Sequence, residues 1–419
     1  MIRSILGTVG TRMMMTVMSL LVVMAAGHGL GAEGVGSVSL IVLGAAIILL
    51  VMNVVAGGGL VYLTPRYGTE QLRWPAYGWV TFIGLLGYVL LRQVPVVPQE
   101  WVMPVSIIAI LQGLFNAHLG LLLGCQRIAA HNGLLVLQSV LLALLFWVLL
   151  HLDGAVVMDY VHSAYMALGA VVVISGVLSI RRRSSDEVTR TTALAPLFRQ
   201  GIPAQAANAL QLINYRFAYL LVERASGMAG LGLFSVTTQL AEGAWLVPKS
   251  IGMVLYTRVS NSARSREQVT LALTAVKASV ATTAMAALVL ILVPDTFYRW
   301  LFGAGINGLW PLLLLMTPGL LAMAASQALS HYLSGSGMVL QNALSSGIGA
   351  VVTLGLGTAL IPTHGLHGAA ITTSCAYIAA LMHQWFVFRR ITRSRAKDLL
   401  PVKGDVEALR TLVVRALGR

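Results

Sequence analysis

Long apolar runs recur along almost the entire chain, and each is about as long as a helix that crosses a bilayer. At about 20 residues per crossing, the runs predict about twelve spans. Helices are expected because they satisfy their own backbone hydrogen bonds where water is absent. Strands of a membrane barrel would instead alternate over about ten residues. The sequence therefore predicts an all-α polytopic membrane protein, with spans at roughly 5–26, 37–63, 76–92, 102–124, 133–151, 160–180, 200–223, 231–255, 269–293, 308–333, 341–361 and 368–388.

The placement of the basic residues orients these spans. The net charge of +14 would suit a nucleic-acid partner, but the charges are not clustered as such a partner requires. With the N-terminus in the cytoplasm, 21 of the 28 Lys and Arg residues lie on the inner side, against Arg92, Arg224 and Arg299 outside. Such a bias follows the positive-inside rule. We expect a multi-pass protein of the bacterial inner membrane with both termini in the cytoplasm, the lipid bilayer as partner and no nucleic acid.

A polar and charged stretch at residues 181–199 separates two apolar blocks. It predicts a cytoplasmic linker between an N-terminal six-helix lobe, residues 1–180, and a C-terminal six-helix lobe, residues 200–390. Residues 391–419 form a basic tail. Within the tail an apolar face beside arginines suits an interfacial helix on anionic lipid, although a solvated tail has the same composition.

The two halves repeat short features in the same order. Glycine-spaced turns follow the first span, at residues 31–39, and the seventh span, at residues 227–235. Later, Gly124 to Arg127 with Asn132 is echoed by Gly335 to Gly337 with Asn342. Ordered internal repeats of this kind are typical of duplicated transporters. They predict a duplicated transporter with two pseudo-symmetric six-helix lobes.

The stretch 231–259 is long enough to cross a bilayer but contains Glu242 and Lys249. A charge at membrane depth costs about 2.5 to 3.5 kcal/mol, so it is expected to face protein or water. Seven residues apart, the two charges would share one face of a regular helix. Pro248 lies between them and removes a backbone donor, so we expect a bend there.

Charged residues deep in the spans are mostly cationic. Arg12, Arg216 and Lys249 stand against Glu242, so the interior is expected to bind an anion, and a diphosphate suits Arg and Lys donors. Two alternatives stay open. Arg12 could be a flanking anchor whose head reaches the cytoplasmic interface, and Arg216 could form a salt bridge with Glu242, which would otherwise carry a coupling proton.

Amides and hydroxyls accompany these charges. Gln211, Asn214 and Gln239 in the seventh and eighth spans are candidates for hydrogen bonds to sugars. The same residue types also join neighbouring helices. No metal-ligand spacing occurs in the sequence, and no cofactor or metal is expected.

Four segments give the chain a family resemblance. They read LGAEGVGSVSL at 30–40, NYRFAYLLVE at 214–223, GLFSVTTQLAEGAWLVPKSIGMVLYTRVS at 232–260 and GLHGAAITTS at 365–374. With them the sequence resembles the polysaccharide and O-antigen (Wzx-type) flippases of the multidrug/oligosaccharidyl-lipid/polysaccharide (MOP) exporter superfamily. The resemblance implies twelve spans in two lobes around a central cavity and movement of a polyprenyl-diphosphate-linked glycan by alternating access. The chain departs from the family pattern at His28 and Lys249, where related members often have Arg and Asn.

The leading hypothesis is a lipid-linked oligosaccharide flippase for surface polysaccharide biosynthesis, with glycan polymerase or other biosynthesis proteins as candidate partners. A multidrug or ion-coupled exporter of the same superfamily is the first alternative. A membrane glycan polymerase or glycosyltransferase is the second, but the longest outer loop, 151–162, is too short to hold a catalytic site. We therefore expect a transporter rather than an enzyme.

Overall fold

The computed structural model describes residues 2–152, 154–180, 194–261 and 265–399, and within these residues every regular element is a helix. Most of the predicted linker and the tail beyond residue 399, with its expected interfacial helix, lie outside the described residues. The elements are α1 (Ile2–Ala56), α2 (Gly58–Gln93), α3 (Gln99–Gly124), α4 (Ile128–Leu152), α5 (Val157–Ile180), α6 (Leu194–Gly243), α7 (Leu246–Asn261), α8 (Ser265–Leu292), α9 (Asp295–Phe302), α10 (Leu309–Gly335), α11 (Val339–Thr392) and the 3₁₀ helix η1 (Ala396–Leu399).

Four long helices contain a reversal at a glycine. Gly31, Gly68, Gly227 and Gly365 have φ values of 68°, 74°, 69° and 55° inside α1, α2, α6 and α11. Positive φ is open to glycine and costly for other residues. The start of α2 continues α1, and α7 continues α6. Divided at the four glycines, the described residues contain twelve helical segments long enough to span a bilayer. The predicted all-α, polytopic fold class is confirmed.

Seven stretches of the described residues are apolar and long enough to cross a membrane: Gly10–Gln93, Gln99–Gly124, Ile128–Leu152, Val157–Ser179, Glu267–Leu292, Leu309–Gly335 and Val339–Thr392. The first and last are long enough for more than one crossing. The α6 and α7 segment is not among the seven. These two helices contain the predicted seventh and eighth spans.

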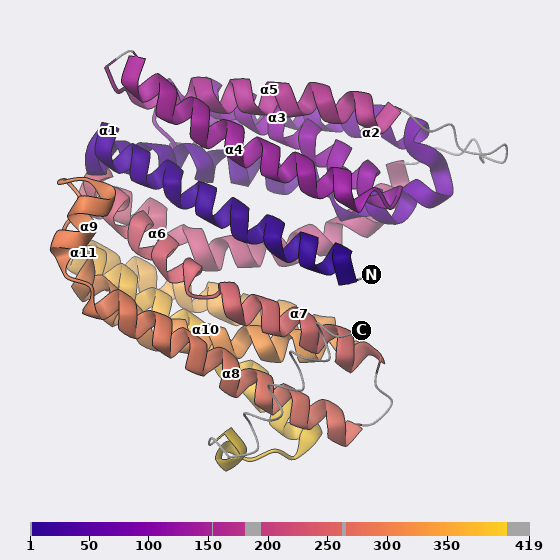
Figure 1. Ribbon diagram of the computed structural model, residues 1–419, viewed down its shortest axis with the longest axis vertical. Helices are drawn as coiled ribbons and strands as arrows, with labels where there is room; N and C mark the ends of the chain where they lie inside the picture. Colours follow the sequence, from indigo (N-terminus) through magenta and orange to yellow (C-terminus); the bar gives the residue numbers. More distant parts are fainter. Residues whose placement is uncertain (1, 153, 181–193, 262–264, 400–419) are drawn as a thin grey trace. The chain divides into compact units, whose positions relative to one another are not determined.

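The described residues form two compact units. Unit 1 contains Arg3–Ala209 together with Phe302–Gly305, and unit 2 contains Leu210–Leu301 and the chain from Ile306 onward. In unit 1, α3 packs against α2 and α5, and α5 also packs against α4. These helices run roughly alongside one another (Figure 1). In unit 2, α10 packs against α7, α8 and α11.

The same local backbone geometry occurs in both units. Gly31 and Gly227 have almost identical angles, with ψ values of −170° and −175°. The turns after α3 and α10 also share one pattern of backbone hydrogen bonds. After α3, the N–H groups of Cys125, Gln126 and Arg127 donate to the carbonyls of residues 121, 123 and 122. After α10, those of Ser336, Gly337 and Met338 donate to the carbonyls of residues 332, 334 and 333. These matches support an internal duplication.

The structure corrects one residue pairing in the predicted repeat. His131 Nδ1 contacts the Leu119 carbonyl at 3.4 Å, and Asn342 Nδ2 donates to the Ser330 carbonyl at 2.9 Å. Both bonds connect residues twelve positions apart after the equivalent turn. The counterpart of Asn342 is therefore His131 rather than Asn132.

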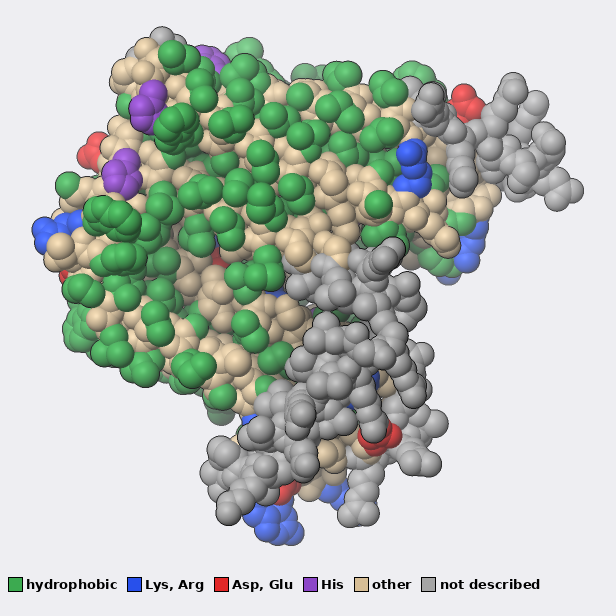
Figure 2. Space-filling model, in the orientation of Figure 1, with side chains coloured by type: hydrophobic (Ala, Val, Ile, Leu, Met, Phe, Trp, Pro, Cys, Tyr) green, Lys and Arg blue, Asp and Glu red, His purple; other side chains and the backbone are tan. Residues whose placement is uncertain are grey.

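Apolar side chains dominate the exposed flanks of the spans. Phe82, Val173 and Leu340 are 58%, 67% and 70% exposed. Hydrophobic atoms cover much of the face in Figure 2, and Lys and Arg side chains lie mostly near its margins. An apolar band of this kind suits a lipid environment.

Candidate functional site

The best-defined polar site lies in unit 2, on the two arms of α6. Gly227 reverses the helix and brings residues on either side of it together. The Arg216 Nη2 atom lies 2.9 Å from Glu242 Oε1, and the two side chains are 32% and 35% exposed. The salt bridge that the sequence left open is thus formed, and it joins the seventh span to the eighth.

Arg216 is also fixed by its own arm. Its Nη1 donates to the Tyr219 hydroxyl at 2.5 Å, and the guanidinium lies 5.0 Å from the centre of the Tyr219 ring. The Tyr219 hydroxyl in turn contacts Thr238 Oγ1 on the other arm at 2.5 Å. The Glu242 carboxylate and the hydroxyl and ring of Tyr219 therefore hold the cation in position.

A break in the eighth span follows Glu242. The helix α6 ends at Gly243 and α7 begins at Leu246. Pro248 cannot donate to the Ala244 carbonyl, which explains why the ladder is interrupted at this point. Trp245 fills the break, with 2% of its surface exposed and its indole N–H donating to the Leu320 carbonyl at 3.2 Å. The bend expected beside the charges is present.

The break corrects the expected placement of Lys249. Glu242 and Lys249 were predicted to share one face of a regular helix, but they lie on different helices, so regular helical spacing does not relate them. The Lys249 side chain is exposed, and its backbone N–H donates to the Trp245 carbonyl at 2.9 Å. Arg12, on α1 in unit 1, is exposed as well.

The three candidate amides differ in their surroundings. Asn214 is 6% exposed and its Oδ1 accepts from Thr353 Oγ1 on α11 at 3.1 Å, so it joins two helices. Gln211 is exposed, and its Nε2 donates to the Tyr215 hydroxyl at 3.4 Å. Gln239 is half-buried. Of the three, Gln211 is the most open to a ligand.

Comparison with solved structures shows which known fold the chain shares. No family model matches the sequence, and no curated protein matches it significantly. Solved structures do match. An inward-facing multidrug resistance MATE transporter of the MOP superfamily has a TM-score of 0.72 at 14% identity, covering 93% of this chain and 98% of its own. The lipid II flippase MurJ in an inward closed conformation has a TM-score of 0.72 at 13% identity, covering 97% and 91%.

A third match is a MOP superfamily transporter from Pyrococcus furiosus, described by the reverse polarity of its binding pocket. Its TM-score is 0.63 at 16% identity, with 93% of this chain and 95% of that chain covered. The chain shares the fold of these transporters. At these identities the likeness establishes the fold alone, and it covers nearly the full length of each protein compared.

Within this fold, unit 1 contains a polar cluster that was not predicted from the sequence. His118 on α3 is 3% exposed and contacts hydroxyls of Tyr77 on α2 and Ser175 on α5. In the sequence these residues are far apart and each lies in an apolar run. A histidine within the fourth span was the available signal, but only the packing of α2, α3 and α5 reveals its partners.

Proposed function

We propose that this chain is a flippase that moves a polyprenyl-diphosphate-linked oligosaccharide from the inner to the outer leaflet of the bacterial inner membrane. It would act by alternating access, with both termini in the cytoplasm, and supply surface polysaccharide biosynthesis. The single observation that carries the proposal is the partly exposed Arg216, held in place on α6 within the predicted seventh span. The fold shared with the lipid II flippase MurJ supports it.

The geometry at Arg216 suits an oxyanion. A guanidinium has donors in a planar fork that match carboxylate and phosphate oxygens alike. Here Glu242 occupies one side of that fork at 2.9 Å. A diphosphate oxygen reaching the same side would form a charge-assisted bond of the same kind. We therefore infer that substrate and Glu242 compete for Arg216, with Lys249 as a further cationic contact of the diphosphate. Arg12, on α1 in unit 1, stays a predicted contact of the substrate.

Competition gives Glu242 a defined role. A carboxylate released from Arg216 at membrane depth loses its counter-charge, and a charge at that depth is costly unless protein or water compensates it. Taking up a proton would neutralise it. Glu242 is thus proposed to hold Arg216 in the unloaded state and to be protonated when substrate is bound.

The second candidate is a multidrug or ion-coupled exporter. It is favoured by one observation, because the multidrug MATE transporter matches with the same TM-score as MurJ. Organic cations require a free carboxylate in the site. Glu242, the acidic residue of this cluster, is bound to Arg216, and so this candidate is second.

The test replaces Arg216 and Lys249 separately with Ala in a strain that depends on this chain for surface glycan. Surface glycan and the lipid-linked intermediate are measured at matched protein levels. We expect glycan to fall at least about tenfold for Arg216→Ala, which corresponds to about 1.4 kcal/mol of lost interaction, and the intermediate to accumulate. Arg224→Ala, an exposed arginine on the same helix, is the matched control and should behave as wild type.

Normal glycan in both the Arg216 and the Lys249 variants would contradict the site. A deletion strain with unchanged glycan and altered drug resistance would instead support the exporter.

A further inference from the structure

One side of α7 in unit 2 carries exposed polar residues. Lys249 and Tyr256 are both exposed, and they lie seven residues apart on one continuous helix, so they share that side. Another side of α7 is buried, because Leu255 and Val259 belong to a core formed with α8 and α10. A charge at membrane depth is costly in lipid. We therefore expect the side with Lys249 and Tyr256 to face water rather than lipid.

The His331 ring of α10 lies at the edge of this exposed side. Gly252 is placed between Lys249 and Tyr256 along α7, and a Cβ at Gly252 would collide with the His331 ring. The centres of the Tyr256 and His331 rings are 6.5 Å apart. Tyr256 nevertheless remains 44% exposed. The imidazole thus fills the space that a side chain at position 252 would take, and leaves part of the phenol open.

The side of α10 that carries His331 leads back to the Arg216 site. Met323, Gln327 and His331 are spaced by four residues and share one side of the helix. At the Met323 end, the Tyr215 hydroxyl of α6 lies 3.9 Å from Met323 Sδ, and Tyr215 directly precedes Arg216. At about 1.5 Å per residue, Met323 and His331 are about 12 Å apart along the helix axis. This length accommodates more than one sugar ring.

Gln327, in the middle of this side of α10, has a buried acceptor that is not used. Its Oε1 atom is buried and accepts no hydrogen bond from the described residues. A buried acceptor without a donor is unfavourable, and a donor that reaches it relieves the cost. The position therefore favours a ligand that brings hydroxyl groups.

We propose that Gln327, His331 and Tyr256 form a sugar-binding strip, which holds the first sugars of the lipid-linked glycan while Arg216 holds its diphosphate. A sugar hydroxyl donates to Gln327 Oε1. The C–H groups of a sugar ring pack on the open part of the Tyr256 phenol, because the face of an aromatic ring carries partial negative charge. His331 supports the Tyr256 ring through their aromatic contact. This inference rests on the proposed function, and it adds the residues that distinguish a glycosylated lipid from a bare one.

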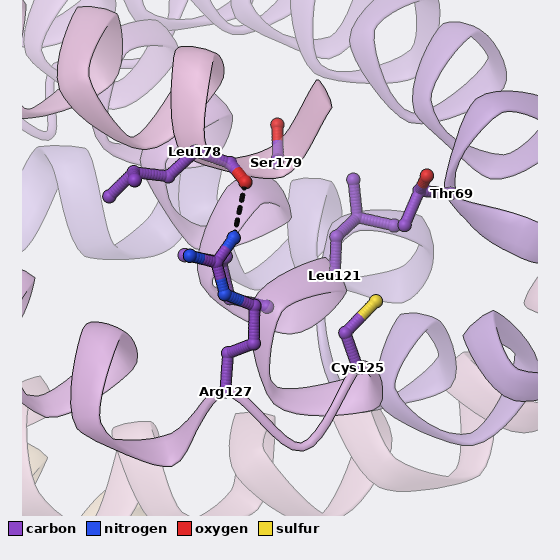
Figure 3. A pocket seen from close by; sticks show the side chains of 7 residues that line it. Thr69, Leu121, Cys125, Arg127, Leu178 and Ser179 are labelled. Atoms are coloured by element: carbon purple, nitrogen blue, oxygen red, sulfur yellow. Dashed lines mark hydrogen bonds between the residues drawn. The ribbon is translucent and has the colours of Figure 1, made fainter. Parts of the chain in front are cut away.

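A cavity in unit 1 provides a contrast to the strip. It lies at the turn between α3 and α4 and has a volume of about 230 Å³. Its arginine, Arg127, already donates to the Leu178 carbonyl at 2.7 Å, and leucine side chains form much of the wall (Figure 3). A sugar would find few available polar groups there. Residues of α2 in unit 1 are therefore suitable as controls outside the strip.

The test compares the binding of two lipids to the full chain in nanodiscs, by titration of fluorescently labelled protein. One lipid is a polyprenyl diphosphate without sugar, and the other is the lipid-linked intermediate extracted from the deletion strain. We expect the wild type to bind the glycosylated lipid at least about tenfold more tightly than the bare one. Gln327→Met and Tyr256→Ala should each lower this preference at least about threefold. Both variants should bind the bare lipid as the wild type does, which also shows that they are folded.

Unit 1 contains a matched control for each variant. Gln71 also has a buried Oε1 that accepts no hydrogen bond from the described residues, and Tyr62 is 49% exposed. Gln71→Met and Tyr62→Ala should keep the wild-type preference for the glycosylated lipid.

Equal binding of both lipids by the wild type would overturn the strip and leave the diphosphate site intact. An unchanged preference in both Gln327→Met and Tyr256→Ala, or equal weakening of both lipids in these variants, would overturn it as well. Failure of the wild type to bind either lipid, or binding that Arg216→Ala leaves unchanged, would instead contradict the proposed function and the strip together.

Discussion

The long helices α1 and α6 have the same backbone geometry at a glycine reversal, but the side chains on either side of the reversal differ. Each reverses at a glycine with φ near 70°, Gly31 or Gly227. Counted from these glycines, the positions of Arg216 and Glu242 in α6 correspond to Leu20 and Ala46 in α1. Both helices therefore contain this reversal, here called the hinge. Of the two helices, only α6 has an ion pair across its hinge.

The consequence is a division of roles within one fold. Near the α1 hinge the equivalent positions are apolar, so α1 can pack against other helices without polar partners. In α6 the ion pair, Tyr219 and Thr238 lie across the hinge. Four sets of substitutions test this difference between α1 and α6.

The largest effect is expected from placing the cation in the apolar copy. Leu20→Arg should lower the free energy of unfolding by about 3 kcal/mol, the cost of a charged side chain at membrane depth. Adding Ala46→Glu should recover about 1 kcal/mol or more if the hinge brings the two positions together as it does in α6. Denaturant unfolding in mixed micelles measures both. No recovery in the double variant would show that the two hinges position side chains differently.

Removing the cation from α6 should have the next largest effect. Arg216→Ala leaves Glu242 without its partner and should cost about 2 kcal/mol, between the values for exposed and buried ion pairs. Arg216→Ala with Glu242→Gln removes the lone carboxylate and should be more stable than the single variant, although it still lacks the substrate contact. Unfolding and glycan export are measured on the same variants. Equal stability of single and double variants would contradict a structural role for the pair.

The hinges themselves should respond equally in both copies. A Cβ at Gly31 or Gly227 would meet no atom within 4 Å, so Gly→Ala at either site tests backbone strain alone. The expected cost is about 1.5 kcal/mol for each. The helical glycines Gly10 and Gly355 also have open space around the Cβ position, and their Ala variants should be neutral or slightly more stable. A large difference between the two hinge variants, measured by thermal unfolding, would argue against a shared hinge.

The smallest effect is expected at the helix-joining amide. Thr353→Val removes the donor to Asn214 Oδ1 and should cost about 1 kcal/mol, because a buried acceptor loses its partner. Thr358→Val, on the exposed side of the same helix α11, is the control and should be near neutral. Loss of glycan export in Thr353→Val without loss of stability would move Asn214 from the framework to the binding site.

Much of the fold could be predicted from the sequence because membrane-spanning helices are specified locally. A run of about 20 apolar residues specifies a helix wherever it lies in the chain. Glycine spacing also marked the reversals at Gly31 and Gly227, and Pro248 marked the break after Gly243. The candidate charges Arg216 and Glu242 could be selected because ions deep in apolar runs are costly and therefore few.

The partners of those charges were decided by the tertiary structure. The sequence left Arg216 as either a free cation or half of a salt bridge, and only the reversal at Gly227 brings Glu242 to 2.9 Å. It treated Asn214 as a sugar ligand or a helix contact, and the packing of α11 supplies Thr353. His118 was not selected at all, since Tyr77 and Ser175 reach it from other helices. Hydropathy acts along the chain, whereas hydrogen bonds and ion pairs depend on contacts between distant residues, so the sequence determined the helices and the fold determined their polar partners.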